Sequence, residues 1–124
     1  MDDTRPLFQQ IADRIANDIV SGTLPEETQV PSTNEFASFL RINPATAGKG
    51  VALLVDTGVL YKKRGIGMFV ATGARARLIA ERRESFRDQY VAPLLAEAHK
   101  LGIDADQLVR LIRDTTPTQK ETSS

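Results

Sequence analysis

The fold is decided by residues 30–70, which read VPSTNEFASFLRINPATAGKGVALLVDTGVLYKKRGIGMFV. The first part predicts two short helices, because apolar residues recur three and four positions apart behind polar capping residues. The last part predicts two β-strands and a tight turn, because apolar and aromatic residues flank a Gly-x-Gly sequence. The expected helices are 32–40 and 43–57, and the expected strands are 59–63 and 68–71.

Both helices have a recognisable first turn. Ser32 and Glu35 fit a capping box, in which each side chain satisfies a backbone N–H at the helix start. Asn43 is a suitable cap for the next helix, and Pro44 suits its first position, where a missing N–H leaves no hydrogen bond unmade. Residues 41–42 form the turn between the helices. The order helix, short turn, helix and hairpin predicts a winged helix-turn-helix, a DNA-reading fold.

A supporting helix is expected before this stretch, over residues 6–21. Its apolar residues recur every four positions, which places them on one face. They are Leu7, Ile11, Ile15 and Ile19. Pro6 is expected at the first helical position and Gly22 at the C-terminal cap. Residues 22–29 are expected to form a polar loop.

The segment after the hairpin predicts a long amphipathic helix over 74–101, kinked or divided at Pro93. Asp104 is expected to cap a last helix that runs to about Arg113. The chain is therefore expected to be mainly α with a small β-hairpin, a winged helix-turn-helix followed by a helical, hairpin-like extension. The expected domains are a DNA-binding domain over 1–73, a dimerisation or effector region over 74–114, and a disordered tail over 115–124.

Composition excludes several classes of protein. The chain has 124 residues, 41% hydrophobic and 26% charged, which suits one globular domain or a small domain with an appendage. No apolar run approaches the roughly 20 residues of a membrane span, and the polar N-terminus is unlike a secretory signal. The absence of cysteine excludes disulfides and thiolate metal sites and suits a cytoplasmic location. Net charge is zero, but five basic residues against one acid give residues 41–64 a local balance of +4.

That local charge and the expected fold point to contact with double-stranded DNA. A helix fits the major groove with its first turns nearest the base edges, and helix N-termini and a basic glycine-containing wing can approach phosphates. Three alternatives stay open: Ser32 as a cap only, Lys49 as an ordinary solvated lysine, and the basic hairpin as ordinary solvated surface. The candidate DNA-binding residues are Ser32, Thr33, Asn34, Asn43, Ala45, Thr46, Lys49, Lys63, Arg64, Gly65 and Gly67.

The remaining polar residues do not indicate an enzyme. His99 has no cysteine or second histidine beside it, so a zinc site is not expected. The sequence contains no nucleophile and base set, phosphate loop or metal cluster, and no cofactor is expected. The acidic residues of the C-terminal helices fit a solvated charged face, since nothing singles out a pair.

The C-terminal apolar stripe is expected to pair two copies of the chain. One long helix and one short helix cannot enclose a core alone, so they need a second surface. A twofold pairing would place two recognition helices on half-sites about 34 Å apart along an inverted repeat. The candidate dimerisation residues are Ile79, Phe86, Tyr90, Leu94, Leu101, Leu108, Leu111 and Ile112.

Four segments in this order resemble the GntR family of bacterial transcriptional regulators over roughly residues 5–71. They include the helix PLFQQIADRIANDIVSGTL, the pattern Pro-Ser-x-x-Glu at 31–35 and the wing pattern Gly-x-Gly-x-Phe-Val at 65–70. The third helix, which starts Ile-Asn-Pro-Ala-Thr at 42–46, is most similar to the YtrA-type branch, whose C-terminal part is short and helical. Asn34, Pro44 and Gly48 stand where many members carry DNA-contacting arginines. This departure implies a different operator, or greater reliance on phosphate contacts and DNA shape.

The resemblance implies a sequence-specific transcriptional regulator of the repressor type, acting as a homodimer. Its DNA affinity would be modulated by a small-molecule effector, or would not be modulated at all. The alternative is a winged-helix module whose third helix binds protein, which the weak basic character of that helix favours.

Overall fold

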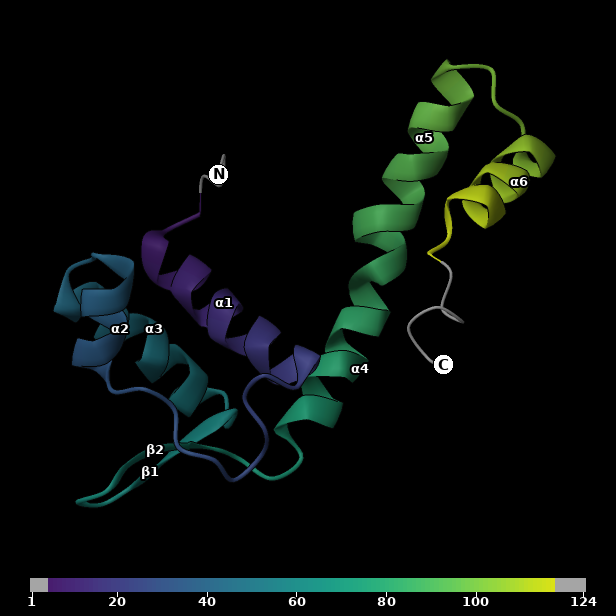
Figure 1. Cartoon of the computed structure of the whole chain (residues 1–124). Coiled ribbons are helices and arrows are strands. Elements are labelled where there is room, and N and C mark those ends of the chain that lie inside the picture. The colour runs from purple at the N-terminus through teal and green to yellow at the C-terminus, as the bar shows by residue number, and fades with distance from the viewer. Residues whose placement is uncertain (1–4, 118–124) are drawn as a thin grey trace. The chain divides into compact units, whose positions relative to one another are not determined.

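The computed structural model describes residues 5–117, which form helices and one antiparallel hairpin (Figure 1). The elements are α1 (Leu7–Ser21), α2 (Thr33–Leu40), α3 (Pro44–Asp56), β1 (Leu60–Lys63), β2 (Gly67–Val70), α4 (Ala74–Phe86), the π-helical η1 (Arg87–Val91), α5 (Ala92–Lys100) and α6 (Ala105–Thr115). Two compact units divide between Arg82 and Arg83. The expected fold class, mainly α with a winged helix-turn-helix, is confirmed.

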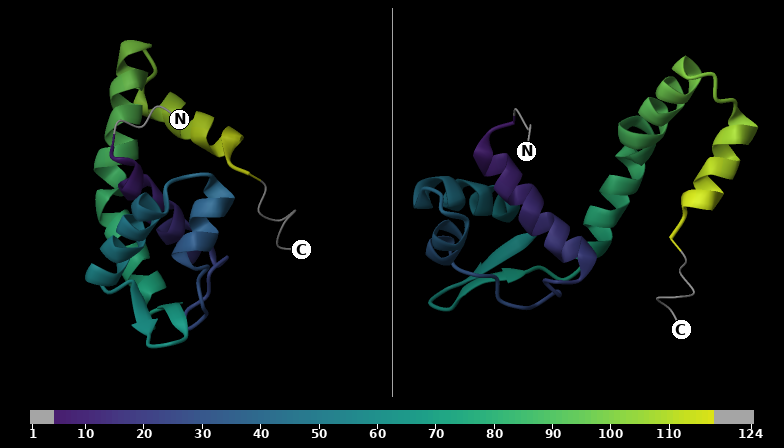
Figure 2. Two further views of the ribbon diagram at one scale, coloured as in Figure 1. Left: turned by 90° about the vertical axis from the view of Figure 1, so that its left-hand side faces the viewer. Right: turned by 45° about the horizontal axis from the view of Figure 1, so that its top comes forward.

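The core of the first unit lies where α1, α2 and α3 meet the hairpin, with the three helices on the same side of it (Figure 2, right). Ile15, Ile19, Leu60 and Val70 are its most deeply buried large side chains. Each such side chain contributes roughly 1.5–3 kcal/mol by leaving water. Ile11, Ile15 and Ile19 of the predicted four-residue repeat therefore face the core, whereas Leu7, in the first turn of α1, is 48% exposed.

The helix caps are largely the predicted ones. The Ser32 hydroxyl accepts from the Glu35 amide at 3.1 Å, and the Glu35 carboxylate accepts from the Ser32 amide at 2.8 Å. The Asn43 side chain accepts from the Ala45 amide at 2.7 Å. The placement of Pro6 inside the first helix was wrong. Its backbone is extended, with ψ 144°, and its carbonyl accepts the first helical hydrogen bonds, which is the position of a cap.

Two glycines inside α3 have different surroundings. A Cβ on Gly50 would lie 2.8 Å from the Phe8 carbonyl oxygen and 3.0 Å from Ile11, so α1 and α3 approach too closely for any side chain there. A Cβ on Gly48 would meet only Thr33, at an ordinary 3.5 Å. Close helix packing thus explains Gly50, and nothing in the structure explains Gly48.

The hairpin has a third, short partner that the sequence reading missed. β1 and β2 pair with Leu60 opposite Val70 and Lys63 opposite Gly67. On the other edge of β2, the Val30 amide donates to the Met68 carbonyl at 2.9 Å, and the Val70 amide donates to residue 28 at 3.1 Å. The end of the expected loop 22–29 is therefore an extended edge segment.

The expected long helix over 74–101 is divided into α4, η1 and α5. Pro93 lies in the first turn of α5 and has no N–H to donate, and the Ala92 amide donates to the Arg87 carbonyl five residues back. This wider turn accommodates the proline, because its ring would otherwise collide with the preceding turn. Ala74 and Leu78 at the start of α4 are buried in the first core, so the first unit extends past the expected boundary at residue 73.

The second unit ends with α6, which begins with a capping box between Asp104 and Gln107. The helix continues to Thr115, so the predicted start of the tail at residue 115 was at least one residue too early. The rest of that prediction, residues 118–124, lies outside the described residues. Ala98 and Leu108 are buried, whereas most other large apolar side chains of the unit are exposed. None of the helices in residues 5–117 combines the length and apolar content that membrane crossing requires.

Candidate nucleic-acid interface

The helix starts of α2 and α3 present polar groups to solvent. The Ser32 hydroxyl caps α2 by accepting the Glu35 amide hydrogen, and its own O–H remains for donation to a ligand. Asn34 is exposed in the first turn, and Thr33 is half-buried beside Gly48. Asn43 uses its side-chain oxygen as a cap and keeps its NH2 group for a ligand.

The outer face of α3 is small and weakly polar. Ala45 and Lys49 are exposed. Thr46, which follows Ala45 in the sequence, is half-buried. The next core positions, Ala47 and Gly50, are buried against the other helices. α3 therefore offers DNA only a few polar atoms, chiefly the Thr46 hydroxyl and the Lys49 ammonium, for a base edge or a phosphate.

The Lys49 side chain is not extended away from α3. Its Nζ lies 4.6 Å from the centroid of the Phe8 ring, in the first turn of α1. A cation–π contact at an exposed site contributes about 0.5–1 kcal/mol, so Lys49 can be released to a phosphate at small cost. This contact was not predicted, because Phe8 fits the apolar pattern of the first helix like any core residue.

The wing carries its basic residues in two different states. Lys63 lies over the hairpin's aromatic pair, with its Nζ 4.2 Å from the centroid of the Phe69 ring. That ring is 6.0 Å from the ring of its cross-strand partner Tyr61. Arg64, by contrast, is exposed at the tip and has no hydrogen bond or ion pair within residues 5–117. Arg64 is therefore more available to a phosphate than Lys63.

The wing tip also contains groups that the sequence reading did not select. Ile66 is 62% exposed between the two turn glycines. Gln29 donates from Nε2 to the Ile66 carbonyl at 3.0 Å, which holds the turn from outside the hairpin. A Cβ on Gly67 would lie 2.4 Å from the Gln29 Nε2, and Gly67 also has a φ of 148°. The backbone angle thus favours glycine at this position, and any larger side chain would have to displace the Gln29 amide.

The base of the wing is tied to the preceding loop by the Glu27 carboxylate. It accepts hydrogen bonds from the Thr72 hydroxyl and from the Tyr61 hydroxyl. The Thr72 hydrogen bond, followed by that of Tyr61, lowers the pKa of Glu27, because both donors stabilise the charged form. The hydrogen bond between Tyr61 and Glu27 in turn raises the pKa of Tyr61. These bonds fix where the hairpin leaves the domain.

The structure thus brings the candidate DNA-binding residues together in one unit, on the first turns of α2 and α3 and on the hairpin (Figure 1). Their side chains are exposed except for Thr33 and Thr46, which are half-buried. The wing glycines divide in the same way, Gly65 exposed and Gly67 half-buried. Within residues 5–117, no group of three or more metal-ligating side chains is found.

Comparisons with known proteins agree with the fold of the first unit. Residues 7–70 match the family model described as "Bacterial regulatory proteins, gntR family". The HTH-type transcriptional repressor YtrA of Bacillus subtilis (strain 168) is 24% identical, over 93% of this chain and 88% of its own length. A GntR family transcriptional regulator from Listeria monocytogenes is similar in structure, with a TM-score of 0.71 and 28% identity over 94% of this chain and 100% of that chain. The AraR DNA-binding domain in complex with operator ORR3 has a TM-score of 0.53 and 28% identity over 57% of this chain and 86% of that chain.

Proposed function

Because the chain belongs to the gntR family of bacterial regulatory proteins and is a DNA-binding transcriptional regulator, we propose that it represses transcription as a homodimer on an inverted-repeat operator. The family resemblance read from the sequence is confirmed, and the chain is a regulator rather than an enzyme. Repression is proposed because the similar YtrA of Bacillus subtilis is named a repressor. The proposed location is the cytoplasm, where bacterial DNA lies.

One observation carries the proposed mode of DNA binding: the first turns of α2 and α3 and the wing all present donors from a single unit. In the proposed complex α3 enters the major groove, and Thr46 and Lys49 contact base edges or phosphates. Arg64 at the wing tip contacts the backbone across the adjacent minor groove. With few polar groups on α3, phosphate contacts supply most of the affinity.

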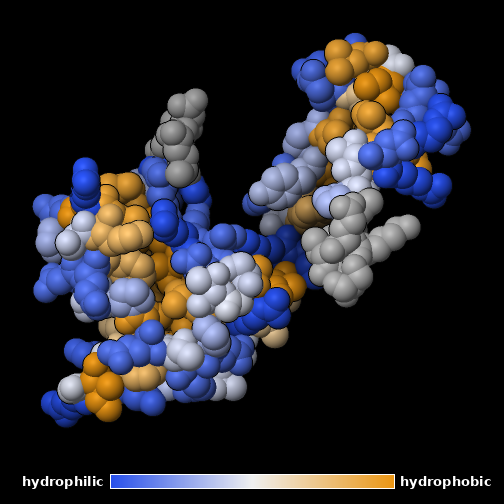
Figure 3. Space-filling view, in the orientation of Figure 1, coloured by the Kyte–Doolittle hydropathy of each residue, from blue (hydrophilic) through white to orange (hydrophobic). Residues whose placement is uncertain are grey.

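Pairing is proposed from the exposed apolar side chains of the second unit, which appear orange in Figure 3. Phe86 and Tyr90 stack with ring centroids 5.5 Å apart, yet they are 55% and 64% exposed. Apolar surface of this extent is typical of an interface. The other exposed members are Leu94, Leu95, Leu101, Val109, Leu111 and Ile112.

Two of the candidate dimerisation residues have different surroundings. Leu108 is 6% exposed within one chain, so we assign it to the packing inside the second unit. Ile79 is half-buried in α4. We expect the fully exposed members to contribute most of the contact between copies.

The test is selection of bound sequences from a random duplex DNA pool, with the mass of the free protein measured by light scattering. We expect enrichment of two identical half-sites in inverted orientation, with centres separated by about one helical turn. The mass should be twice that of one chain at micromolar concentration. A single unrepeated site together with a monomeric mass would contradict the proposal. The alternative of a module that binds only protein gains no support from these relatives, one of which is solved on operator DNA.

A further inference from the structure

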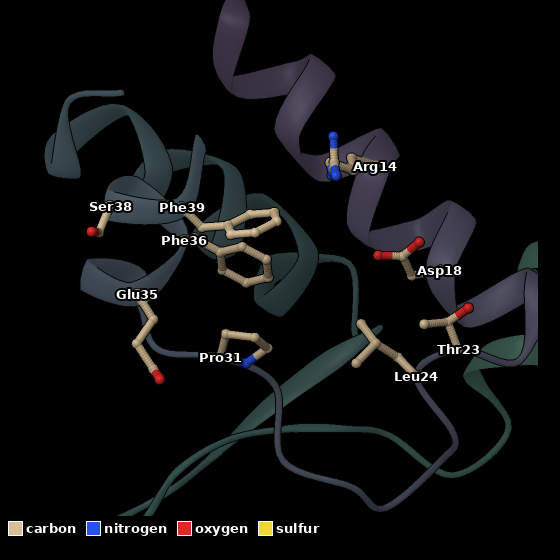
Figure 4. Close-up of a pocket in the computed structure, with 9 residues that line it drawn as sticks. All are labelled: Arg14, Asp18, Thr23, Leu24, Pro31, Glu35, Phe36, Ser38 and Phe39. Atoms are coloured by element: carbon tan, nitrogen blue, oxygen red, sulfur yellow. The ribbon is translucent and has the colours of Figure 1, made fainter. Parts of the chain in front are cut away.

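A groove separates α1 from α2 on the first unit, away from the candidate DNA-binding residues of α3 and the wing (Figure 4). Its volume is about 650 Å³, within the range of small-molecule sites. Figure 4 shows Phe36 and Phe39 on the α2 side, with Leu24 and Pro31 between the helices. The lining residues are Arg14, Asp18, Thr23, Leu24, Pro31, Glu35, Phe36, Ser38 and Phe39.

The apolar part of the groove is aromatic and incompletely covered. Phe36 is 9% exposed and belongs to the core, whereas Phe39 is 76% exposed. An exposed phenylalanine beside a concave surface offers a ring face to a ligand, because burial of its apolar area is favourable. Within residues 5–117, no other aromatic ring forms a pair with Phe39.

The charged part of the groove favours a cation. Asp18, on α1, is half-buried, and its carboxylate takes part in no hydrogen bond or ion pair within residues 5–117. Glu35, on α2, uses one carboxylate oxygen to accept from the Ser32 amide. The opposing charge is Arg14, one turn before Asp18, which is exposed and unpaired in the described part of the chain. The groove therefore has two carboxylates against one guanidinium.

We propose that this groove binds a small amphipathic organic cation, and that its occupancy changes the affinity of the protein for DNA. The positive group lies between the Phe39 ring and the Asp18 carboxylate, since both aromatic faces and carboxylates attract a cation. The apolar remainder contacts Leu24, Pro31 and the edge of Phe36. An anion of the same shape would be repelled by the two carboxylates.

The coupling to DNA follows from the connection of α2 to the rest of the unit, and this part rests on the proposed mode of DNA binding. At Gly50 the backbone of α3 packs closely against α1, where a Cβ would lie 2.8 Å from the Phe8 carbonyl oxygen. α2 faces the groove with Phe39 and carries Thr33 and Asn34 at its first turn. A ligand that prefers one position of α2 therefore shifts the population of DNA-competent molecules.

The binding test uses benzyltrimethylammonium as the probe and phenylmethanesulfonate as the anion of similar size, titrated into the full chain. Amide chemical shifts in NMR spectra locate the site and give the dissociation constant. We expect shifts at groove residues with the cation only. Phe39→Ser should weaken binding about tenfold, Asp18→Asn should also weaken it, and Arg14→Gln should strengthen it. Leu7→Ser, which removes an exposed apolar side chain outside the groove, should leave it unchanged.

The coupling test measures affinity for a selected duplex with and without the saturating cation. A shift that disappears in Phe39→Ser supports the effector role, and an unchanged affinity with the cation bound overturns that role. Absence of groove shifts, equal binding of the anion, or unchanged binding in both Phe39→Ser and Asp18→Asn overturns the site itself. If the protein binds the cation but no duplex at all, the proposed DNA-binding mode fails and the site stands.

Discussion

The Lys49 ammonium lies 4.6 Å from the centroid of the Phe8 ring, so the only basic side chain in α3 is held against the first turn of α1. This contact places the charge at the junction of two helices instead of at the tip of an extended side chain. Phe8 therefore positions the Lys49 ammonium on the proposed DNA-binding surface.

Loss of Lys49 should remove one phosphate contact. Lys49→Ala is expected to weaken operator binding and to reduce the slope of log affinity against log salt by about 1. Phe8→Leu keeps the apolar contact but releases the ammonium, so affinity should rise by about two- to fivefold. Fluorescence anisotropy at graded salt measures both, with Lys100→Ala as the control. An unchanged slope in Lys49→Ala would show that this residue does not contact the backbone.

Two of the basic wing residues, Arg64 and Lys63, should differ in importance for DNA binding. Arg64→Ala is expected to weaken binding by roughly 1 kcal/mol or more, because the free guanidinium makes charge-assisted contacts. Lys63→Ala should have a smaller effect, since this ammonium already lies 4.2 Å from the Phe69 ring centroid. The same anisotropy titration compares the two variants directly. A larger loss in Lys63→Ala would reverse the assignment.

The α3 glycines provide a matched pair for stability. Gly48→Ala should raise the free energy of unfolding by up to about 1 kcal/mol, because alanine favours helix and its Cβ meets only ordinary contact. Gly50→Ala should lower it despite the same gain in propensity, because the Cβ would lie 2.8 Å from the Phe8 carbonyl oxygen. Urea unfolding followed by circular dichroism tests this. Equal effects in the two variants would rule out close α1–α3 packing as the reason for Gly50.

The contact between Gln29 and the wing turn should appear as a coupling energy in a double-mutant cycle. Gly67→Ala is expected to destabilise the domain by about 1–3 kcal/mol, through its backbone angle and the Gln29 side chain. In the Gln29→Ala background, the same change should cost less, because only the backbone strain remains. Thermal unfolding of the four proteins gives the coupling. Additive effects would mean that Gln29 yields freely to a larger residue.

The Glu27 carboxylate should make stability depend on pH. Its pKa is lowered in the folded chain from an ordinary value of 4.5, by Thr72 first and then Tyr61. Its stabilising contribution is therefore present above that value and lost as pH falls through the lower folded pKa. The excess stability of the wild type over Glu27→Gln should shrink between about pH 6 and pH 3. Thr72→Val, which removes one of the two hydrogen bonds, should reduce this excess stability as well. A stability difference between wild type and Glu27→Gln that does not change with pH would contradict the assigned hydrogen bonds.

Local sequence was sufficient for features that one segment decides. Ser32, Glu35 and Asn43 could be assigned as caps because a cap depends on residues within one turn. The hairpin position followed from its turn glycines, and the division of the long helix followed from Pro93. The π-helical turn before Pro93 could not be predicted in the same way, because a proline indicates that a helix is interrupted but not which backbone conformation accommodates it.

The features that were missed join residues distant in sequence. Nothing near Gln29 indicates that it reaches the wing turn, and its polar neighbours made the segment look like a loop. The groove was missed because Phe39 fitted the apolar stripe of the second helix, although it is 76% exposed. Whether a helix residue faces a core or a groove depends on the neighbouring helices, which periodicity alone does not specify.

The extended segment at 28–30 has one more consequence, which concerns aggregation. It occupies the outer edge of β2, where an unpaired strand would otherwise accept a strand from another molecule. Within residues 5–117, the outer edge of β1 pairs with no further strand, and it carries Lys62 and Lys63. Charged residues on a four-residue edge hinder strand addition. The hairpin is thereby protected from edge-to-edge strand pairing between copies.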